Sequence, residues 1–178
     1  MKSKGFTLLE ILLTMGIIGI IASIMLRLMP NIMPDVNKAQ FLRALTATKI
    51  VVQDMINATA LYPDDYGSDT YGFKNTTMPL YGEYADDEFS GQAKFPLIFA
   101  DRFGEDATES GGEYSFYSMR DNLTYKIKGD NNGNYTIKFY NKDSENIGGV
   151  EVTYDGETKC LAGVKDYCSG DLTNLRRE

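Results

Sequence analysis

The sequence contains no histidine and no tryptophan, and only two of its 178 residues are cysteine. Without histidine, the chain lacks the base of Ser-His-Asp and Cys-His sites, a common zinc ligand and the usual proton shuttle near neutral pH. Two cysteines are too few for an all-cysteine zinc or iron–sulfur centre in one chain. Carboxylates, lysines and tyrosines remain available, but we expect no enzymatic activity, no catalytic residue and no resident cofactor.

Positive charge is also scarce, because 18 Lys and Arg residues stand against 25 Asp and Glu residues and give a formal net charge of -7. A domain that grips nucleic acid by its phosphates normally has a basic surface. Nucleic acid is therefore not an expected partner. The length suits one domain with an extension, and 43% hydrophobic residues are typical of a folded chain rather than a disordered one.

Apolar residues are concentrated near the N-terminus. Residues 11–26 carry no charge, and Glu10 is the single charged residue of the segment 6–26. As a helix this segment would be about 31 Å long, the thickness of a bilayer hydrocarbon core. Lys2 and Lys4 precede it and favour a cytoplasmic N-terminus with an exported C-terminus. We expect a transmembrane or fibre-core helix over residues 6–29.

Two simpler interpretations leave part of this segment unexplained. A secretory signal would end in a small-x-small cleavage site, which Ala22-Ser23-Ile24 supplies poorly. A plain membrane anchor fits the length but not Glu10, because an ionised carboxylate near a membrane is costly unless it is paired or lies at the interface.

The residues around Glu10 follow a recognisable order, Lys2-Ser3-Lys4-Gly5-Phe6-Thr7-Leu8-Leu9-Glu10. This segment closely resembles the prepilin signal of type IV pilins and pseudopilins. The resemblance implies cleavage between Gly5 and Phe6 by prepilin peptidase, methylation of the new amine of Phe6, and a role for Glu10 in fibre assembly by neutralising a neighbour's N-terminal amine. Residues 1–5 would then be a leader that is removed.

A second helical pattern follows the apolar segment. Pro30 and Pro34 would kink or break the first helix. Mainly apolar residues then recur at three- and four-residue steps and would form one stripe along a helix. This pattern predicts an amphipathic helix over residues 35–61 that ends before Pro63. The stripe contains Phe41, Leu45, Thr48, Val52, Met55 and Thr59. We interpret residues 30–62 as the amphipathic half of one long, kinked helix, the architecture that the resemblance also implies.

Residues 63–113 are rich in Asp, Glu, Gly, Tyr and Phe and show little periodicity. We expect an acidic connecting region packed by its aromatic side chains, with a helical turn near residues 96–103. The expected anchors are Tyr66, Tyr71, Tyr81, Tyr84, Phe89, Phe95, Phe99 and Phe103. Its acidic clusters, at residues 64–65, 86–88 and 105–106, are interpreted as solvated surface rather than a cation site.

Alternation of apolar and polar residues predicts strands at residues 114–118, 123–128, 134–140 and 149–154. Asp155-Gly156 predicts a tight hairpin into a further strand at 157–161. The expected fold class is α+β and pilin-like: a long N-terminal helix packed on an antiparallel meander of three to five strands, with residues 114–178 forming the sheet and the C-terminal tail.

Two further features concern ligands and bonds. Cys160 and Cys168 can pair if the head is exported, because that compartment is oxidising, and many members of the family that the chain resembles have such a C-terminal disulfide; free thiols are the alternative. Asp130-Asn131-Asn132-Gly133-Asn134 has oxygen ligands at alternate positions, as calcium requires, but position 141 is Asn141 rather than a bidentate glutamate. We favour a polar hairpin turn over a calcium loop.

The resemblance implies a structural subunit, a pilin or minor pilin of a bacterial type IV pilus-like fibre. Its partners would be prepilin peptidase, other pilin subunits and the inner-membrane assembly platform. The protein would first be a single-pass protein of the inner membrane with its head in the periplasm, and then part of a periplasmic or extracellular fibre. The alternatives are a pseudopilin of a type II secretion system and a membrane-anchored periplasmic binding protein or enzyme.

Overall fold

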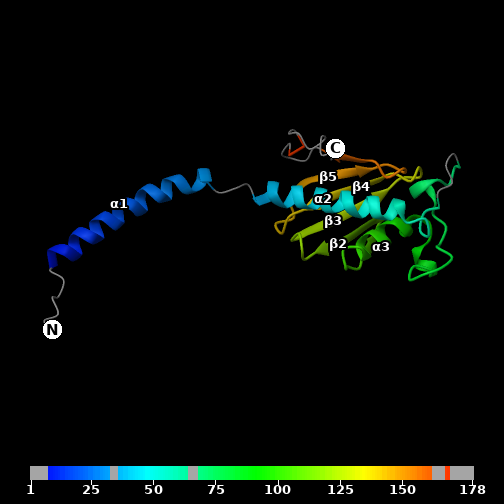
Figure 1. Ribbon diagram of the computed structural model, residues 1–178, viewed down its shortest axis with the longest axis horizontal. Coiled ribbons are helices and arrows are strands. Elements are labelled where there is room, and N and C mark those ends of the chain that lie inside the picture. The colour runs from blue at the N-terminus through cyan, green and yellow to red at the C-terminus, as the bar shows by residue number, and fades with distance from the viewer. Residues whose placement is uncertain (1–7, 33–35, 64–67, 162–166, 169–178) are drawn as a thin grey trace. The chain divides into compact units, whose positions relative to one another are not determined.

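The computed structural model describes residues 8–32, 36–63, 68–161 and 167–168, and the backbone alone for residues 25–32. The chain divides between Val36 and Asn37 into an N-terminal unit and a larger C-terminal unit, which we call the head. Figure 1 shows the helices and strands of both units. Each unit is described by itself.

The described residues of the N-terminal unit form the helix α1 (Leu8–Ile32). α1 continues through Pro30 to Ile32, three residues beyond the expected end of this segment at residue 29. In the part of the chain that the structure describes, no helix combines the length and the hydropathy that crossing a membrane requires.

The head begins with α2 (Val36–Asn57). Six of its side chains are buried against the head: Phe41, Ala44, Leu45, Thr48, Val52 and Met55. The predicted stripe is therefore correct except at its end, where Thr59 is exposed. α2 stops at Asn57 because the chain turns sharply there, with the N–H groups of Leu61 and Tyr62 both donating to the carbonyl oxygen of Ala58.

A connection with short helices leads from α2 to the sheet: η1 (Gly72–Lys74), η2 (Asp87–Phe89), η3 (Gly91–Ala93) and α3 (Lys94–Asp101). Aromatic rings hold it against the head. The Phe73 ring packs edge-on against those of Tyr62 and Phe95 at 4.9 and 4.8 Å, and Phe95 stacks on Tyr135 at 4.0 Å. Among the expected anchors, Tyr81 is an exception, because it is 84% exposed, and Tyr66 lies outside the described residues.

In the described part of the chain, six antiparallel strands follow in meander order. They are β1 (Thr108–Ser110), β2 (Glu113–Ser118), β3 (Leu123–Gly129), β4 (Tyr135–Tyr140), β5 (Asn146–Val152) and β6 (Thr158–Leu161). The expected number of three to five is wrong. The strand that we missed is β1, whose three exposed residues show no alternation, although Thr108 pairs with Ser115 of β2. Tyr154, expected to end a strand, lies beyond β5 and is exposed.

The core lies between the sheet and the two helices α2 and α3. Phe41 of α2 contacts Phe139 of β4 at 5.9 Å between ring centroids, and Phe99 of α3 contacts Phe116 and Tyr125 of β2 and β3 at 6.1 and 6.4 Å. Alternate residues of the central strands are buried there, as period-two patterning requires. The fold class is α+β, as the sequence predicts.

Candidate assembly segment and C-terminal disulfide

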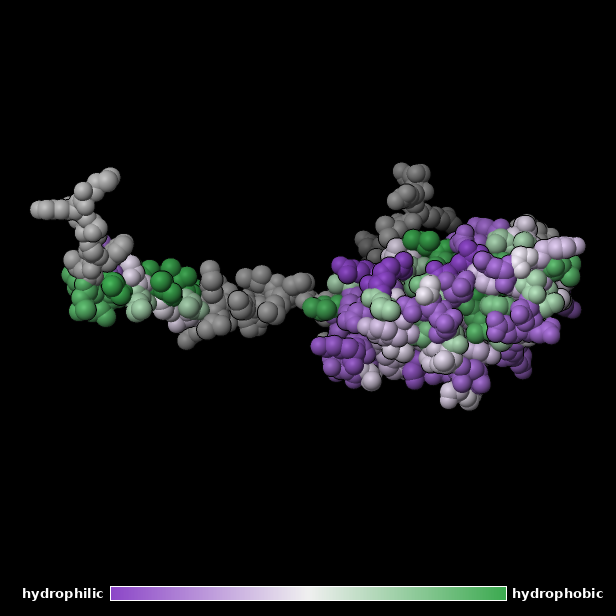
Figure 2. Space-filling view, turned by 90° about the horizontal axis from the view of Figure 1, so that it is seen from below, coloured by the Kyte–Doolittle hydropathy of each residue, from purple (hydrophilic) through white to green (hydrophobic). Residues whose placement is uncertain are grey.

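Between Leu8 and Ile24, where the structure describes its side chains, α1 exposes a surface that is mainly apolar. Its exposed side chains, from 46% at Ile11 to 80% at Leu8, are Leu8, Leu9, Ile11, Leu12, Leu13, Met15, Ile17, Ile18, Ile20, Ile21 and Ile24. In Figure 2 the coloured part of this helix is mainly green, whereas purple, pale and green residues are mixed on the visible face of the head. A continuous apolar surface of this extent marks a contact with another protein or with lipid.

The hydroxyl groups of α1 do not disturb this apolar surface. Thr14 donates from Oγ1 to the carbonyl oxygen of Ile11 at 2.9 Å, and Ser23 donates from Oγ to that of Gly19 at 2.8 Å. At both Gly16 and Gly19, an added Cβ would have no atom within 4 Å. The two glycines therefore leave notches where another helix can approach closely.

Glu10 lies in the first turn of α1 and is exposed. A carboxylate at this end of a helix is favoured by the partial positive charge of the unsatisfied N–H groups. The sequence-predicted cleavage and methylation residues, Gly5 and Phe6, lie outside the described residues. The structure thus places Glu10 among exposed leucines and isoleucines, where a positively charged group from another molecule would be strongly attracted in a medium of low dielectric constant.

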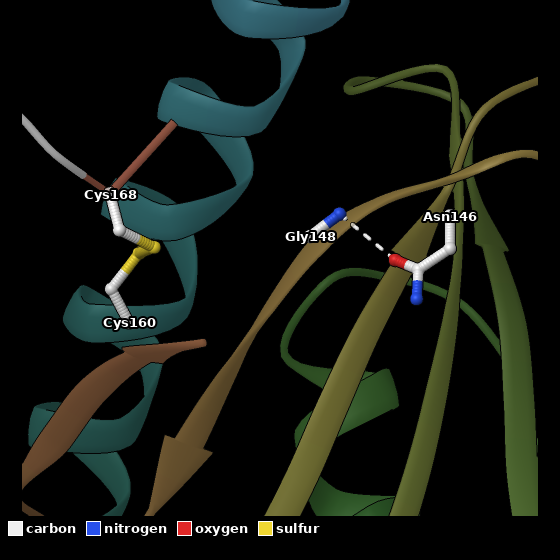
Figure 3. The surroundings of a disulfide bond; sticks show 4 residues. All are labelled: Asn146, Gly148, Cys160 and Cys168. Atoms are coloured by element: carbon white, nitrogen blue, oxygen red, sulfur yellow. Dashed lines mark hydrogen bonds between the residues drawn. A yellow bond between two sulfur atoms is a disulfide. The ribbon is translucent and has the colours of Figure 1, made fainter. Parts of the chain in front are cut away.

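The structure pairs Cys160 of β6 with Cys168, with their Cα atoms 6.0 Å apart (Figure 3). Beside this disulfide, Tyr167 packs its ring against that of Phe41 at 5.7 Å. Figure 3 also shows Asn146 of β5 accepting a hydrogen bond of 2.9 Å from the N–H of Gly148. The disulfide thus ties the chain that follows the last strand to a position next to α2.

The candidate calcium loop is a hydrogen-bonded hairpin turn. Asp130 accepts from the N–H groups of Asn132 and Asn134 at 2.8 and 2.9 Å and from Asn134 Nδ2 at 3.0 Å. Partial burial by itself raises the pKa of Asp130, but these bonds outweigh it and hold the pKa below its usual value. In the next turn, Asn141 Oδ1 accepts hydrogen bonds from the backbone N–H groups of Asp143 and Glu145. Within the described ranges, no group of three or more carboxylates or cysteines is arranged so that it could hold a metal ion.

The acidic clusters of the connecting region are distributed rather than brought together. Asp86, Asp87 and Glu88 are exposed around η2, whereas residues 64–65 lie outside the described residues. Glu105 accepts a hydrogen bond from the N–H of Met119 at 3.2 Å. The carboxylates therefore act as surface and local turn contacts in this structure.

Sequence reasoning missed Lys94, which is only 1% exposed. Its Nζ donates to the carbonyl oxygens of Leu61 and Asn75 at 2.6 and 3.1 Å and lies 4.3 Å from the centroid of the Tyr62 ring. Burial lowers the pKa of Lys94 to about 8. The one signal in the sequence is its place directly before the apolar run of α3, which does not distinguish a buried lysine from a solvated helix start.

Comparison with known families gives one match. Residues 1–26 match the family model of the prokaryotic N-terminal methylation motif. The chain therefore carries the prepilin signal of type IV pilins and pseudopilins, as its resemblance to that signal predicts. The signal implies processing by prepilin peptidase and assembly with other pilin subunits. No curated protein and no solved structure matches the chain.

Proposed function

We propose that the protein is a structural subunit, a pilin or minor pilin, of a bacterial type IV pilus-like fibre. Prepilin peptidase cuts after Gly5, the amine of Phe6 is methylated, and the mature chain joins the fibre through α1. The observation that carries the proposal is the prepilin signal at residues 1–26, within which α1 exposes its large apolar side chains from Leu8 to Ile24.

Burial of these side chains in a fibre keeps them out of water once the subunit has left the membrane. Removing apolar surface from water contributes about 25 cal/mol per Å². Identical helices packed side by side bury this surface without exposing a backbone hydrogen-bonding group, because a helix satisfies its own peptide groups except at its ends. Gly16 and Gly19 supply positions where neighbouring helices come close.

Glu10 gives the assembly its register. A buried carboxylate is costly alone, and pairing with a positively charged group offsets much of that cost. The group we assign is the methylated amine of Phe6 on the neighbouring subunit, which lies four residues before Glu10 in each chain. A subunit added in the wrong register would leave both charges unpaired in an apolar medium, which disfavours that arrangement.

Before assembly, the apolar segment that begins at Phe6 holds the subunit in the inner membrane with its head in the periplasm. Lys2 and Lys4 favour this orientation. The disulfide between Cys160 and Cys168 is consistent with an oxidising compartment for the head. After assembly the segment becomes the fibre core.

The N-terminus of the protein isolated from cells with an active prepilin peptidase tests the proposal. Mass spectrometry should find a chain that begins at Phe6 and carries one additional methyl group. Gly5→Leu should keep residues 1–5, because the peptidase site is then blocked, whereas the neighbouring change Ser3→Ala should be processed as the wild type. A wild-type chain that still begins at Met1 would refute the proposed function.

A further inference from the structure

A groove of about 590 Å³ runs between α2 and the turn that joins β2 to β3. Its apolar lining comes from Leu42, Ala47, Ile50 and Val51, and Arg43 and Arg120 line it as well. We call it the α2 groove. Its volume falls within the roughly 300–1,000 Å³ of pockets that take up small ligands. It is open to another molecule, since the Ile50 side chain is 64% exposed.

The polar groups of the α2 groove leave it with positive charge. Thr46 donates its hydroxyl proton to the carbonyl oxygen of Leu42, within the helix. Asp121 is buried, accepts a hydrogen bond of 2.7 Å from Tyr125 and lies 3.5 Å from Arg120 Nε. The Arg120 side chain nevertheless remains 66% exposed, and Arg43 is exposed too. In a protein with a net charge of -7, an apolar groove with two exposed arginines is suited to an apolar, acidic partner.

The connecting region presents such a surface. Residues 79–88, which we call the acidic loop, expose two large apolar side chains, Leu80 at 78% and Tyr81 at 84%. Four exposed acidic residues follow within the loop: Glu83, Asp86, Asp87 and Glu88. Tyr84, by contrast, is buried, packs on Phe89 at 5.1 Å and donates its hydroxyl proton to Asp101. The loop is thus anchored at Tyr84 and needs little ordering before it binds.

The connecting region near Gln92 and the β2–β3 turn that lines the α2 groove lie toward opposite ends of the head. At one end, Gln92 donates to Asn131 in the β3–β4 turn at 3.1 Å, which places the connecting region beside that turn. At the other end, Asn141 of the β4–β5 turn donates to Asn37 at the start of α2. The β2–β3 turn lies at this second end, because alternate turns of an antiparallel meander share an end. Figure 1 shows the connecting region gathered where α2 ends.

We propose that the acidic loop of one subunit docks in the α2 groove of a second copy of this chain. Leu80 and Tyr81 cover the apolar lining, and the loop carboxylates pair with Arg43 and Arg120. The contact joins two different surfaces, so it can repeat from copy to copy, as the fibre of the proposed function requires. The inference rests on the proposed function and adds to it the contact between neighbouring heads.

The contact is small, below the roughly 1,000 Å² that a stable interface buries on its own. It depends on α1 to hold neighbouring subunits together, which raises the effective concentration of the loop near the groove. The test therefore uses the full chain, assembled in cells with an active prepilin peptidase, rather than separated heads.

Cross-linking between introduced cysteines measures the contact. The variant Ala47→Cys with Tyr81→Cys should give a ladder of covalent oligomers after treatment with a short bismaleimide, because each copy joins the next. Both native cysteines are occupied in the disulfide and do not react. Tyr81→Cys with Lys138→Cys is the matched control, since Lys138 is exposed on β4 outside the groove, and should give at least fivefold less ladder.

Charge reversal gives an independent reading. Arg43→Glu in the Ala47→Cys, Tyr81→Cys background should reduce the ladder at least fivefold, and adding Asp86→Lys and Asp87→Lys should restore it.

A processed, assembled chain without a ladder overturns this inference and leaves the proposed function standing. A cross-link between this chain and a protein of different mass would show that the groove is occupied by another protein and not by a second copy of this chain. A chain that keeps Met1 overturns both proposals.

Discussion

Lys94 donates a hydrogen bond of 2.6 Å to the carbonyl oxygen of Leu61, so a buried ammonium group joins the first turn of α3 to the chain just after α2. The same group donates to Asn75 and lies over the ring of Tyr62. Carbonyl dipoles and an aromatic face, rather than a carboxylate, surround this charge, and burial lowers its pKa to about 8. This arrangement has a consequence for stability as pH changes.

The head should gain stability between pH 8 and 10 through Lys94. The folded-state pKa of about 8 lies below the unfolded value of about 10.4, so the unfolded chain binds more protons in this window and the free energy of unfolding rises with pH. The gain should be ~1–2 kcal/mol. Urea unfolding of the purified full chain in detergent, at pH 8, 9 and 10, measures it.

Lys94→Met is the control for this prediction, because it keeps the length of the side chain without a titrating group. Its free energy of unfolding should change less between pH 8 and 10 than that of the wild type. Above pH 10 the stability of both proteins should fall, since burial raises the pKa of Tyr62 and Tyr135, which the unfolded chain ionises first. Equal slopes for the two proteins below pH 10 would show that Lys94 does not titrate in this range.

Replacing Gly72 with alanine should destabilise the head more than replacing Gly111, a glycine with a similar φ but no atoms near its side-chain position. The φ of Gly72 is +61°, and an added Cβ would overlap the carbonyl oxygen of Tyr154, which accepts the N–H of Phe73 at 2.7 Å. Gly111, with φ +63°, has no atom within 4 Å of an added Cβ. Gly111→Ala should therefore cost only the left-handed strain of about 1–2 kcal/mol.

Gly72→Ala should cost at least ~2 kcal/mol more than Gly111→Ala, because either the η1 turn or the chain at Tyr154 has to move. The difference between the urea midpoints of the two variants measures this effect. Equal midpoints would mean that the contact between η1 and Tyr154 is dispensable for stability.

Removing the disulfide should destabilise the head and release Tyr167 from Phe41. The loop closed by Cys160 and Cys168 is short, and its entropic contribution is about 2–3 kcal/mol. The double change Cys160→Ser with Cys168→Ser should lower the thermal midpoint, and Tyr167→Leu in the oxidised protein should lower it by a smaller amount. A reductant should shift the midpoint of the wild type toward that of the double variant. No shift on reduction would exclude a stabilising role of this bond.

Glu10→Val should be processed and methylated but should not assemble. The change leaves the apolar surface of α1 intact and removes the carboxylate that we assign to the amine of a neighbouring subunit. Sheared surface material, probed with an antibody to the head, measures assembly, and Leu9→Val is the control for a change of side-chain shape in the same turn. Normal amounts of fibre from Glu10→Val would remove Glu10 from the assembly step.

The local sequence was sufficient to predict elements whose apolar residues recur with a clear helical or strand period, and to identify the prepilin signal from its order of residues. The prepilin signal is a run of adjacent residues, so Glu10 was identified without any tertiary contact. The helical stripe from Phe41 to Met55 and the alternation along β3 and β4 likewise arise from the periods of helix and strand. Thr59 and Tyr154 were placed wrongly because each lies just beyond the end of an element, where pattern gives the least information.

The tertiary structure decided the features that depend on residues distant in the sequence. β1 has no pattern of its own and exists because β2 offers it a partner edge. Lys94 is buried because carbonyl groups from two separate segments converge on it, and the α2 groove exists because Arg120 comes to lie beside α2. Sequence by itself determined the N-terminal signal and the α+β class, since these follow from local order and periodicity. Buried charge and surface complementarity required the fold, because they depend on which distant groups meet.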